Sequence, residues 1–159
     1  MIELPEKALS LWQPYAWLVA AGHKPIENRK KAFNQRRFRG PFWIHASEHS
    51  PRTPLETDRY LARHTEVEAL AKSILGPDFT LPDWCDITFG AIIGRAVITG
   101  ILEPKGHMFH KPDVPWHFPD QYGFIIENAV LLEKPVPCKG ALGFWKVPEP
   151  VLAELRSAA

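Results

Sequence analysis

Cysteine is scarce in this chain, and long apolar runs are absent. The 159 residues include only two cysteines, Cys85 and Cys138, which lie far apart and form no C-x-x-C pair. This argues against a disulfide scaffold or a cysteine metal site, and we expect both cysteines to be reduced core residues. No stretch is long and apolar enough to cross a membrane, and the start, MIELPEKALSL, does not resemble a secretory signal. We therefore expect a cytoplasmic protein with no membrane contact.

A strong overall charge is also missing, but the charge is unevenly distributed. The chain has 19 lysines and arginines against 18 aspartates and glutamates, for a net charge of +1. Between residues 24 and 39 there are seven cations and a single anion, Glu27, which is a local surplus of six. The rest of the chain is therefore about five units negative. Charge segregated in this way attracts phosphate groups to one surface.

The pattern of apolar residues predicts one α+β domain over residues 1–159. The 16 prolines favour strands joined by irregular loops over long helices. A capping box at Thr53 and Glu56 predicts a helical insert over 54–75, either as one helix or as two helices broken near His64. A short helix should follow Pro14 and end at Gly22. We predict strands over 8–11, 42–47, 89–98, 122–128, 130–132 and 142–147, an edge segment over 135–140 and a final helix over 149–159.

The glycines within 89–98 indicate a bend, so the predicted sheet is a small, strongly curved one or a barrel. Gly90-x-x-x-Gly94 is not a phosphate loop, because no Lys-Ser/Thr ending follows it. His45 lies inside an apolar strand, where a hydrogen-bonded core histidine is the simple interpretation and a pocket residue is the alternative.

The segment from Gly22 to Arg29 reads G-x-K-x-x-E-x-R, with Lys24, Glu27 and Arg29 at its charged positions. Residues two apart in an extended chain point the same way, so Glu27 and Arg29 should share a face. A carboxylate between two cationic side chains holds both in fixed positions, and the cations keep spare N–H donors for a ligand phosphate or carbonyl group. The simpler interpretation is a surface salt-bridge cluster, which contributes little to stability.

Residues 103–121 form a loop rich in proline and aromatic residues, and it contains His107, His110 and His117. The three histidines raise the possibility of a metal site, but neither cysteine nor an H-E-x-x-H frame accompanies them, and we predict no metal. The loop is expected either to close the end of the barrel or to act as a lid. In the second case Trp116 or Phe118 would stack on a base.

Six motifs, in order, resemble the ASCH domain, a relative of the PUA fold. They are S-L-W-Q-P-Y-A (10–16), G-H-K-P-I-E-N-R (22–29), R-G with W-I-H-A (39–40 and 43–46), F-G-A-I-I-G (89–94), Y-G-F with E-N (122–124 and 127–128) and P-C-K-G-A-L-G-F-W (137–145). The resemblance is greatest to the version at the end of activating signal cointegrator proteins and in bacterial stand-alone homologues.

The resemblance implies a PUA-like small β-barrel with a short N-terminal helix, a helical insert and a cleft lined by Lys24, Glu27 and Arg29. ASCH domains are associated with RNA, or in some members with DNA. A second branch consists of small amidohydrolases that act on acylated cytidine through a lysine, a threonine and a glutamate. Lys24 matches that lysine, Glu27 stands where the threonine would be, and the glutamate has no counterpart that we can place. Nuclease activity has also been attributed to some members.

Three functions follow for testing. The first is a nucleic-acid-binding module, for RNA or single-stranded DNA, because a large cationic surplus suits a polyanion. The second is a small hydrolase, acting on modified nucleosides or as a ribonuclease, in which Lys24, Glu27 and Arg29 are the catalytic residues. The third is a protein-interaction domain that uses the helical insert. We expect a monomer without a cofactor. The candidate binding residues are Trp12, Gln13, Tyr15, Lys24, Glu27, Arg29, Lys30, Lys31, Arg36, Arg37, Arg39, His45 and Trp116.

Overall fold

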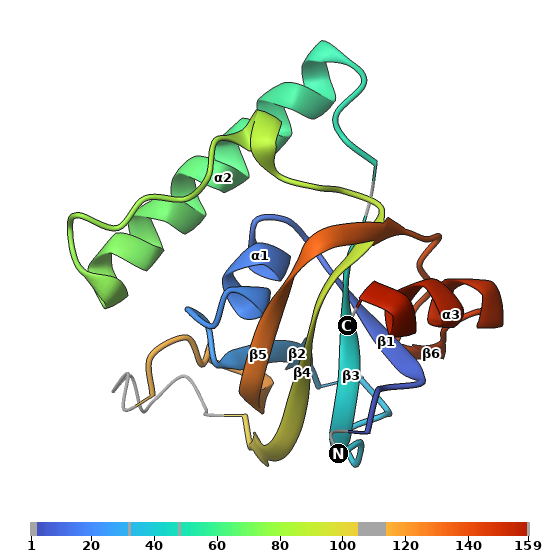
Figure 1. Cartoon of the computed structure of the whole chain (residues 1–159). Helices are drawn as coiled ribbons and strands as arrows, with labels where there is room; N and C mark the ends of the chain where they lie inside the picture. Colours follow the sequence, from blue (N-terminus) through green and yellow to red (C-terminus); the bar gives the residue numbers. More distant parts are fainter. Residues whose placement is uncertain (1–2, 32, 48, 105–113, 159) are drawn as a thin grey trace.

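The computed structural model describes residues 3–31, 33–47, 49–104 and 114–158, and in this part the chain is an α+β protein (Figure 1). Six strands form one sheet: β1 (Lys7–Leu11), β2 (Ile26–Lys30), β3 (Gly40–Ala46), β4 (Ala91–Leu102), β5 (Gln121–Pro137) and β6 (Phe144–Lys146). Three α-helices accompany them: α1 (Tyr15–Ala20), α2 (Pro54–Leu75) and α3 (Glu149–Ala158). A short 3₁₀ turn covers Trp84–Asp86. The predicted α+β class is confirmed.

The sheet has the strand order β2-β5-β4-β3-β1-β6 and curls into a half-barrel. All neighbouring strands are antiparallel except β1 and β3, which run parallel. The pairing of β4 with β5 shifts register three times, between Ile92 and Gly94, Arg95 and Val97, and Ile98 and Gly100. Each shift bends and twists the strand pair. The bend predicted from the glycines is therefore present.

Alternation along β3 sends side chains to both faces of this sheet. Phe42 and Ile44 pack in the cluster that includes the α1 residues Ala16 and Val19. Trp43 points to the other face and packs with α3. The strand is buried on both sides for this reason, which explains its continuous apolar sequence.

One predicted corner is part of a longer strand. We expected separate strands on either side of Asn128, but β5 is continuous from Gln121 to Pro137. Asn128 adopts the left-handed conformation, with φ of 53°, inside this strand. Both halves pair with β4, whereas β2 pairs only with residues 121–125, so within the described ranges the second half has no strand on its other side. Proline is tolerated there because no neighbouring strand needs its N–H.

The helical insert is a single helix, α2, and the predicted capping box is formed. Glu56 N–H donates to Thr53 Oγ1 over 3.2 Å, and the Glu56 carboxylate accepts from Thr53 N–H over the same distance. Val67 and Ala71 of α2 pack in one cluster with Leu18 of α1. In Figure 1, α2 lies as a separate layer beyond α1. Among the described residues, no helix has the length and apolar content to span a membrane.

Candidate functional site

A tight turn at the end of α1 positions Lys24 next to β2. Gly22 adopts φ of 81°, which places the chain in the left-handed region as predicted. The N–H groups of His23 and Lys24 both donate to Leu18 O, over 2.9 and 3.0 Å. The chain therefore reverses tightly after the helix and enters β2 at Ile26.

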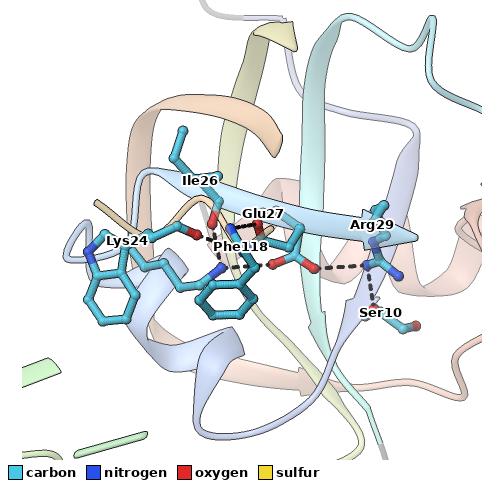
Figure 2. Close-up of polar contacts among 8 residues, drawn as sticks. Ser10, Lys24, Ile26, Glu27, Arg29 and Phe118 are labelled. Carbon is cyan, nitrogen blue, oxygen red and sulfur yellow. Dashed lines mark hydrogen bonds and ion pairs between the residues drawn. The ribbon is translucent and has the colours of Figure 1, made fainter. Parts of the chain in front are cut away.

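Lys24, Glu27 and Arg29 form a chain of charges, in which Lys24 and Glu27 are buried and Arg29 is partly exposed (Figure 2). The Lys24 side chain is 2% exposed; Nζ donates to Ile26 O and lies 3.3 Å from Glu27 Oε2. Glu27 Oε1 lies 3.4 Å from Arg29 Nη2, which also donates to Ser10 O over 3.1 Å. Glu27 and Arg29 share a face of β2, as the alternation predicted, and Lys24 reaches the same carboxylate.

Burial sets the electrostatics of this group. Loss of hydration lowers the pKa of Lys24 below its usual value, and the adjacent Glu27 carboxylate opposes this effect. The Lys24 ammonium lies 5.3 Å from the Tyr15 ring centroid and 5.9 Å from that of Phe118. Burial, followed by the negative charge of Glu27, raises the pKa of Tyr15. Lys24 is therefore held between aromatic faces and one carboxylate, with little water.

A cavity of about 490 Å³ opens beside these charges. Four of its lining residues are aromatic, and Trp12 is the most open of them, with 60% of its surface exposed. The charged chain and four aromatic rings therefore meet in one hollow. The lining residues are Ser10, Leu11, Trp12, Tyr15, Lys24, Glu27, Asn28, Arg29, Lys30, Phe33, Phe118 and Gln121.

Asn28 holds one wall of this cavity in place. Its Nδ2 donates to Trp116 O over 2.8 Å, and its Oδ1 accepts from Phe118 N–H over 2.9 Å. The side-chain amide thereby fixes the backbone of 116–118 against β2. Phe118 reaches the cavity, whereas Trp116 is 4% exposed and packs with Leu18 and α2. Of the two rings proposed for stacking from this loop, only Phe118 lines the cavity.

The other cations of the basic segment, residues 24–39, lie at the cavity or on the surface beside it. Lys30 lines the cavity, and Lys31 lies 3.5 Å from Asp120 Oδ1 in an exposed ion pair. Arg36 donates to the Tyr122 hydroxyl over 2.6 Å, and Tyr122 pairs with Arg29 across β2 and β5. Arg36 therefore lies on the β5 side of the charged chain.

Arg37 and Arg39 are exposed. Arg39 donates to the carbonyl groups of Arg36 and Phe38, over 3.0 and 2.7 Å. These hydrogen bonds lie within residues 36–39. The structure therefore brings Trp12, Tyr15, Lys24, Glu27, Arg29 and Lys30 together in the cavity, and it places Lys31, Arg36, Arg37 and Arg39 on the adjoining surface.

Gln13 is buried and forms hydrogen bonds within the protein core. Its Nε2 donates to Thr88 O over 2.8 Å, and its Oε1 accepts from Trp17 N–H over 3.0 Å. The side chain thus joins the first turn of α1 to the segment before β4, and it does not line the cavity.

His45 is also buried, in a chain of core hydrogen bonds. Its Nε2–H donates to Cys138 O over 2.7 Å, and its Nδ1 accepts from the Ser10 hydroxyl over 2.9 Å. Trp145 Nε1–H donates to the same hydroxyl over 3.1 Å. Burial lowers the pKa of His45, so the neutral ring fits these partners. The simple interpretation, a hydrogen-bonded core histidine, describes this position.

Two of the three loop histidines, His107 and His110, lie outside the described residues. His117 Nε2–H donates to Gln121 O over 2.8 Å, and its ring packs against Gly123. Within the described ranges, no three histidine, cysteine or acidic side chains are grouped as metal ligands would be.

Sequence reasoning did not single out Asn28, Phe33 or Gln121 as site residues. Phe33 is the one aromatic residue between Lys30 and Arg37, and its ring lies 5.5 Å from the Arg29 guanidinium carbon. An aromatic residue inside a basic segment is a sequence signal that could have identified Phe33 as a site residue. Asn28 offered no such signal, because its partners lie 88 and 90 residues away.

Comparison with known proteins identifies the family. A family model described as the ASCH domain matches residues 9–135, well over half of the chain. No curated protein matches. Two crystal structures of ASCH from Zymomonas mobilis are similar, each with 12% sequence identity. A tyrosine-to-phenylalanine mutant gives a TM-score of 0.54, with 95% of this chain and 96% of that one covered. The protein described only as ASCH gives 0.50, with 95% and 93% covered.

At this identity the structures support the fold alone, and they match the α+β half-barrel. The PUA-like architecture that the motifs implied agrees with it. With the family model spanning β1 to most of β5, the chain belongs to the ASCH domain family.

Proposed function

We propose that the chain binds single-stranded nucleic acid, RNA or DNA, with one nucleotide in the cavity beside Lys24, Glu27 and Arg29. The observation that carries this proposal is the cavity, in which aromatic rings lie around the chain of charges formed by Lys24, Glu27 and Arg29. Its volume of about 490 Å³ is within the usual range for a small-molecule site.

The lining suits a base and its hydrogen-bonding edge. Stacking on aromatic rings is the common way to hold an unpaired base, and Trp12 offers the most exposed ring. A lysine ammonium has three donors, and with described residues Lys24 uses two of them, on Ile26 O and Glu27. Arg29 Nε is buried and has no hydrogen-bond partner among the described residues. A ligand acceptor would satisfy these remaining donors.

The basic surface beside the cavity suits the phosphates of the same strand. Lys30 lies at the cavity itself, and Arg36 and Arg37 are exposed on the adjoining segment. Cations arranged beside a stacking pocket are typical of proteins that bind single strands. These cations would position the sugar-phosphate backbone of the strand, and the cavity would contact the base.

The test is a binding titration with short single-stranded RNA and DNA of the same sequence. We expect Trp12→Ala to weaken binding about tenfold, because one stacked base contributes about 1–3 kcal/mol. Trp12 is mostly exposed, so this variant should fold. Leu142→Ala, at a residue that is 99% exposed and lies outside the cavity, is the control. Equal affinity of Trp12→Ala and wild type would exclude the cavity as the base site.

A hydrolase is the second candidate, and the burial of Lys24 favours it. Desolvation lowers the pKa of Lys24, which raises the share of neutral amine that can act as a base. The amine would take a proton from water as the water attacks an amide carbonyl. Arg29 would stabilise the resulting oxyanion, and Glu27 would pass the proton on to the leaving amine.

Incubation with acylated cytidine, followed by chromatography, tests this second candidate. Release of cytidine by wild type, lost in Lys24→Met and kept in Arg36→Ala/Arg37→Ala, would identify an enzyme with a basic steering surface. The oligonucleotides are checked for cleavage in the same samples. If neither binding nor turnover is found, a protein-interaction domain becomes the better hypothesis.

A further inference from the structure

A second cavity lies at the N-terminal half of α2. Its volume is about 310 Å³, and it is lined by His49, Pro51, Glu56, Arg59, Tyr60 and Arg63. Two arginines and one tyrosine supply donors, and Glu56 is the single acid of the lining. The Glu56 carboxylate is already engaged, because it accepts from the N–H groups of Arg52 and Thr53 at the helix start.

Tyr60, one of the lining residues, has a buried donor without a partner. The residue is 3% exposed, yet its hydroxyl forms no hydrogen bond with any described residue. Burial raises the pKa of Tyr60 to about 12, so the hydroxyl stays protonated and able to donate near neutral pH. A buried polar group that lacks a partner is costly, and a bound acceptor would remove that cost.

The second cavity adjoins the first through Trp12 and Arg63. The Arg63 guanidinium carbon lies 5.3 Å from the Trp12 ring centroid and 5.7 Å from that of Tyr60. Trp12 lines the cavity beside Lys24, whereas Tyr60 and Arg63 line the second. Arg63 of α2 therefore lies between the ring of Trp12, which lines the first cavity, and the ring of Tyr60, which lines the second.

We propose that the second cavity binds a backbone phosphate of the same nucleic-acid strand whose neighbouring base occupies the cavity beside Lys24. This inference rests on the proposed function and extends it by one subsite. Arg59 and Arg63 face the phosphate charge, and the Tyr60 hydroxyl donates to one of its oxygens. Trp12 stacks with the strand where it passes from one cavity to the other.

A comparison of two ligands tests the subsite. The affinities of a single nucleoside and of a single-stranded hexanucleotide are measured by calorimetry for wild type, Arg59→Ala and Tyr60→Phe. We expect Arg59→Ala to lower the ratio of hexanucleotide to nucleoside affinity about tenfold, because it removes a charge-assisted phosphate contact. Tyr60→Phe should lower the same ratio by a smaller factor, about threefold, and should fold because the hydroxyl contacts no described partner.

Arg156→Ala is the matched control, because Arg156 is exposed on α3 and pairs with Glu149. If the hexanucleotide binds wild type, Lys24→Met weakens it, and Arg59→Ala behaves as Arg156→Ala, then the subsite is overturned and the proposed function stands. If the hexanucleotide does not bind wild type at all, the proposed function fails and the subsite fails with it.

Discussion

The buried pair of Lys24 and Glu27 makes each charge depend on the other. We expect Glu27→Gln to lower the free energy of unfolding by about 3 kcal/mol, because it leaves the Lys24 ammonium without a counter-charge in a dry site. Urea unfolding at pH 7, followed by fluorescence, measures this change.

Lys31→Gln is the comparison for that experiment. Its ion pair with Asp120 is exposed, and pairs of this kind contribute less than about 1 kcal/mol. A loss in Glu27→Gln no larger than that in Lys31→Gln would contradict this prediction, because it would mean that Lys24 does not remain an unpaired ammonium in a dry site.

His45 predicts a pH dependence of stability. Its pKa is lowered in the folded chain, so below the unfolded value of about 6.5 the unfolded state binds more protons. Stability from this group is fully present above pH 6.5 and decreases as the pH falls toward the folded pKa. His45→Gln should flatten the plot of unfolding free energy against pH below pH 6.5. An unchanged slope in the variant would show that other groups cause the acid dependence.

Individual site residues were predictable only where the pattern is local. Glu27 and Arg29 share a face because of strand alternation, and Gly22 ends α1 in the left-handed region because no other residue does so freely. The burial of Trp116 was not predictable, since it depends on the amide of Asn28 and on α2. No local rule gives contacts between residues so far apart in sequence.

At the level of elements, Gly94 determines how closely α1 approaches the sheet. A Cβ at this position would lie 2.7 Å from Val130 O and 2.8 Å from Ala20 Cβ. We expect Gly94→Ala to lower the free energy of unfolding by about 2 kcal/mol, because backbone and helix must move apart. Thermal unfolding by circular dichroism measures the effect.

Gly100→Ala serves as the control in the same strand. A Cβ there would meet the Ile125 Cδ1 atom at 3.1 Å, and the flexible end of that side chain can move. The alanine also lowers the entropy of the unfolded chain, so this change should cost less than about 1 kcal/mol. Equal losses at both positions would mean that the contact of α1 with β4 does not limit the packing.

Elements were predicted well where capping and turn residues mark their ends. α2 begins at its capping box and runs unbroken through His64, because Val67 and Ala71 continue the stripe that packs on α1. β5 was predicted as two strands because Asn128 reads as a turn. It remains one strand because β4 pairs with both halves and a left-handed Asn128 is accommodated within the pairing.

At the scale of the whole molecule, the separated charge predicts how binding varies with salt. For single strands, each neutralised phosphate contributes a slope of about −0.7 to a plot of log affinity against log salt. With three to four cations engaged, we expect a slope of roughly −2 to −3. Arg36→Ala/Arg37→Ala should reduce its magnitude by roughly 1.4.

Lys134→Ala/Arg156→Ala removes the same number of exposed charges, from β5 and α3 and outside both cavities, and should leave the slope near the wild-type value. A slope near zero for wild type would exclude phosphate-driven binding. Affinities from fluorescence anisotropy at four salt concentrations suffice for this comparison.

The fold as a whole was accessible from sequence because its motifs span the chain in order, from Ser10 to Trp145. The curvature of the sheet was indicated by glycines, but its extent was not, because the register shifts between β4 and β5 depend on both strands. The contact of Arg63 in α2 with Trp12 was also not predictable from the sequence, because the two residues lie in separate segments that only the fold brings together.

A half-barrel, unlike a closed barrel, has two outer strands, and each is a surface on which another chain could add a strand. β6 has only three residues and ends at Lys146, two residues before Pro148, so another chain could form few hydrogen bonds with it. β2 is longer, and three of its five residues are charged: Glu27, Arg29 and Lys30. The residues that prepare the cavity therefore also protect an open sheet edge from self-association. Replacing them with neutral residues to study binding would raise the tendency of the protein to aggregate.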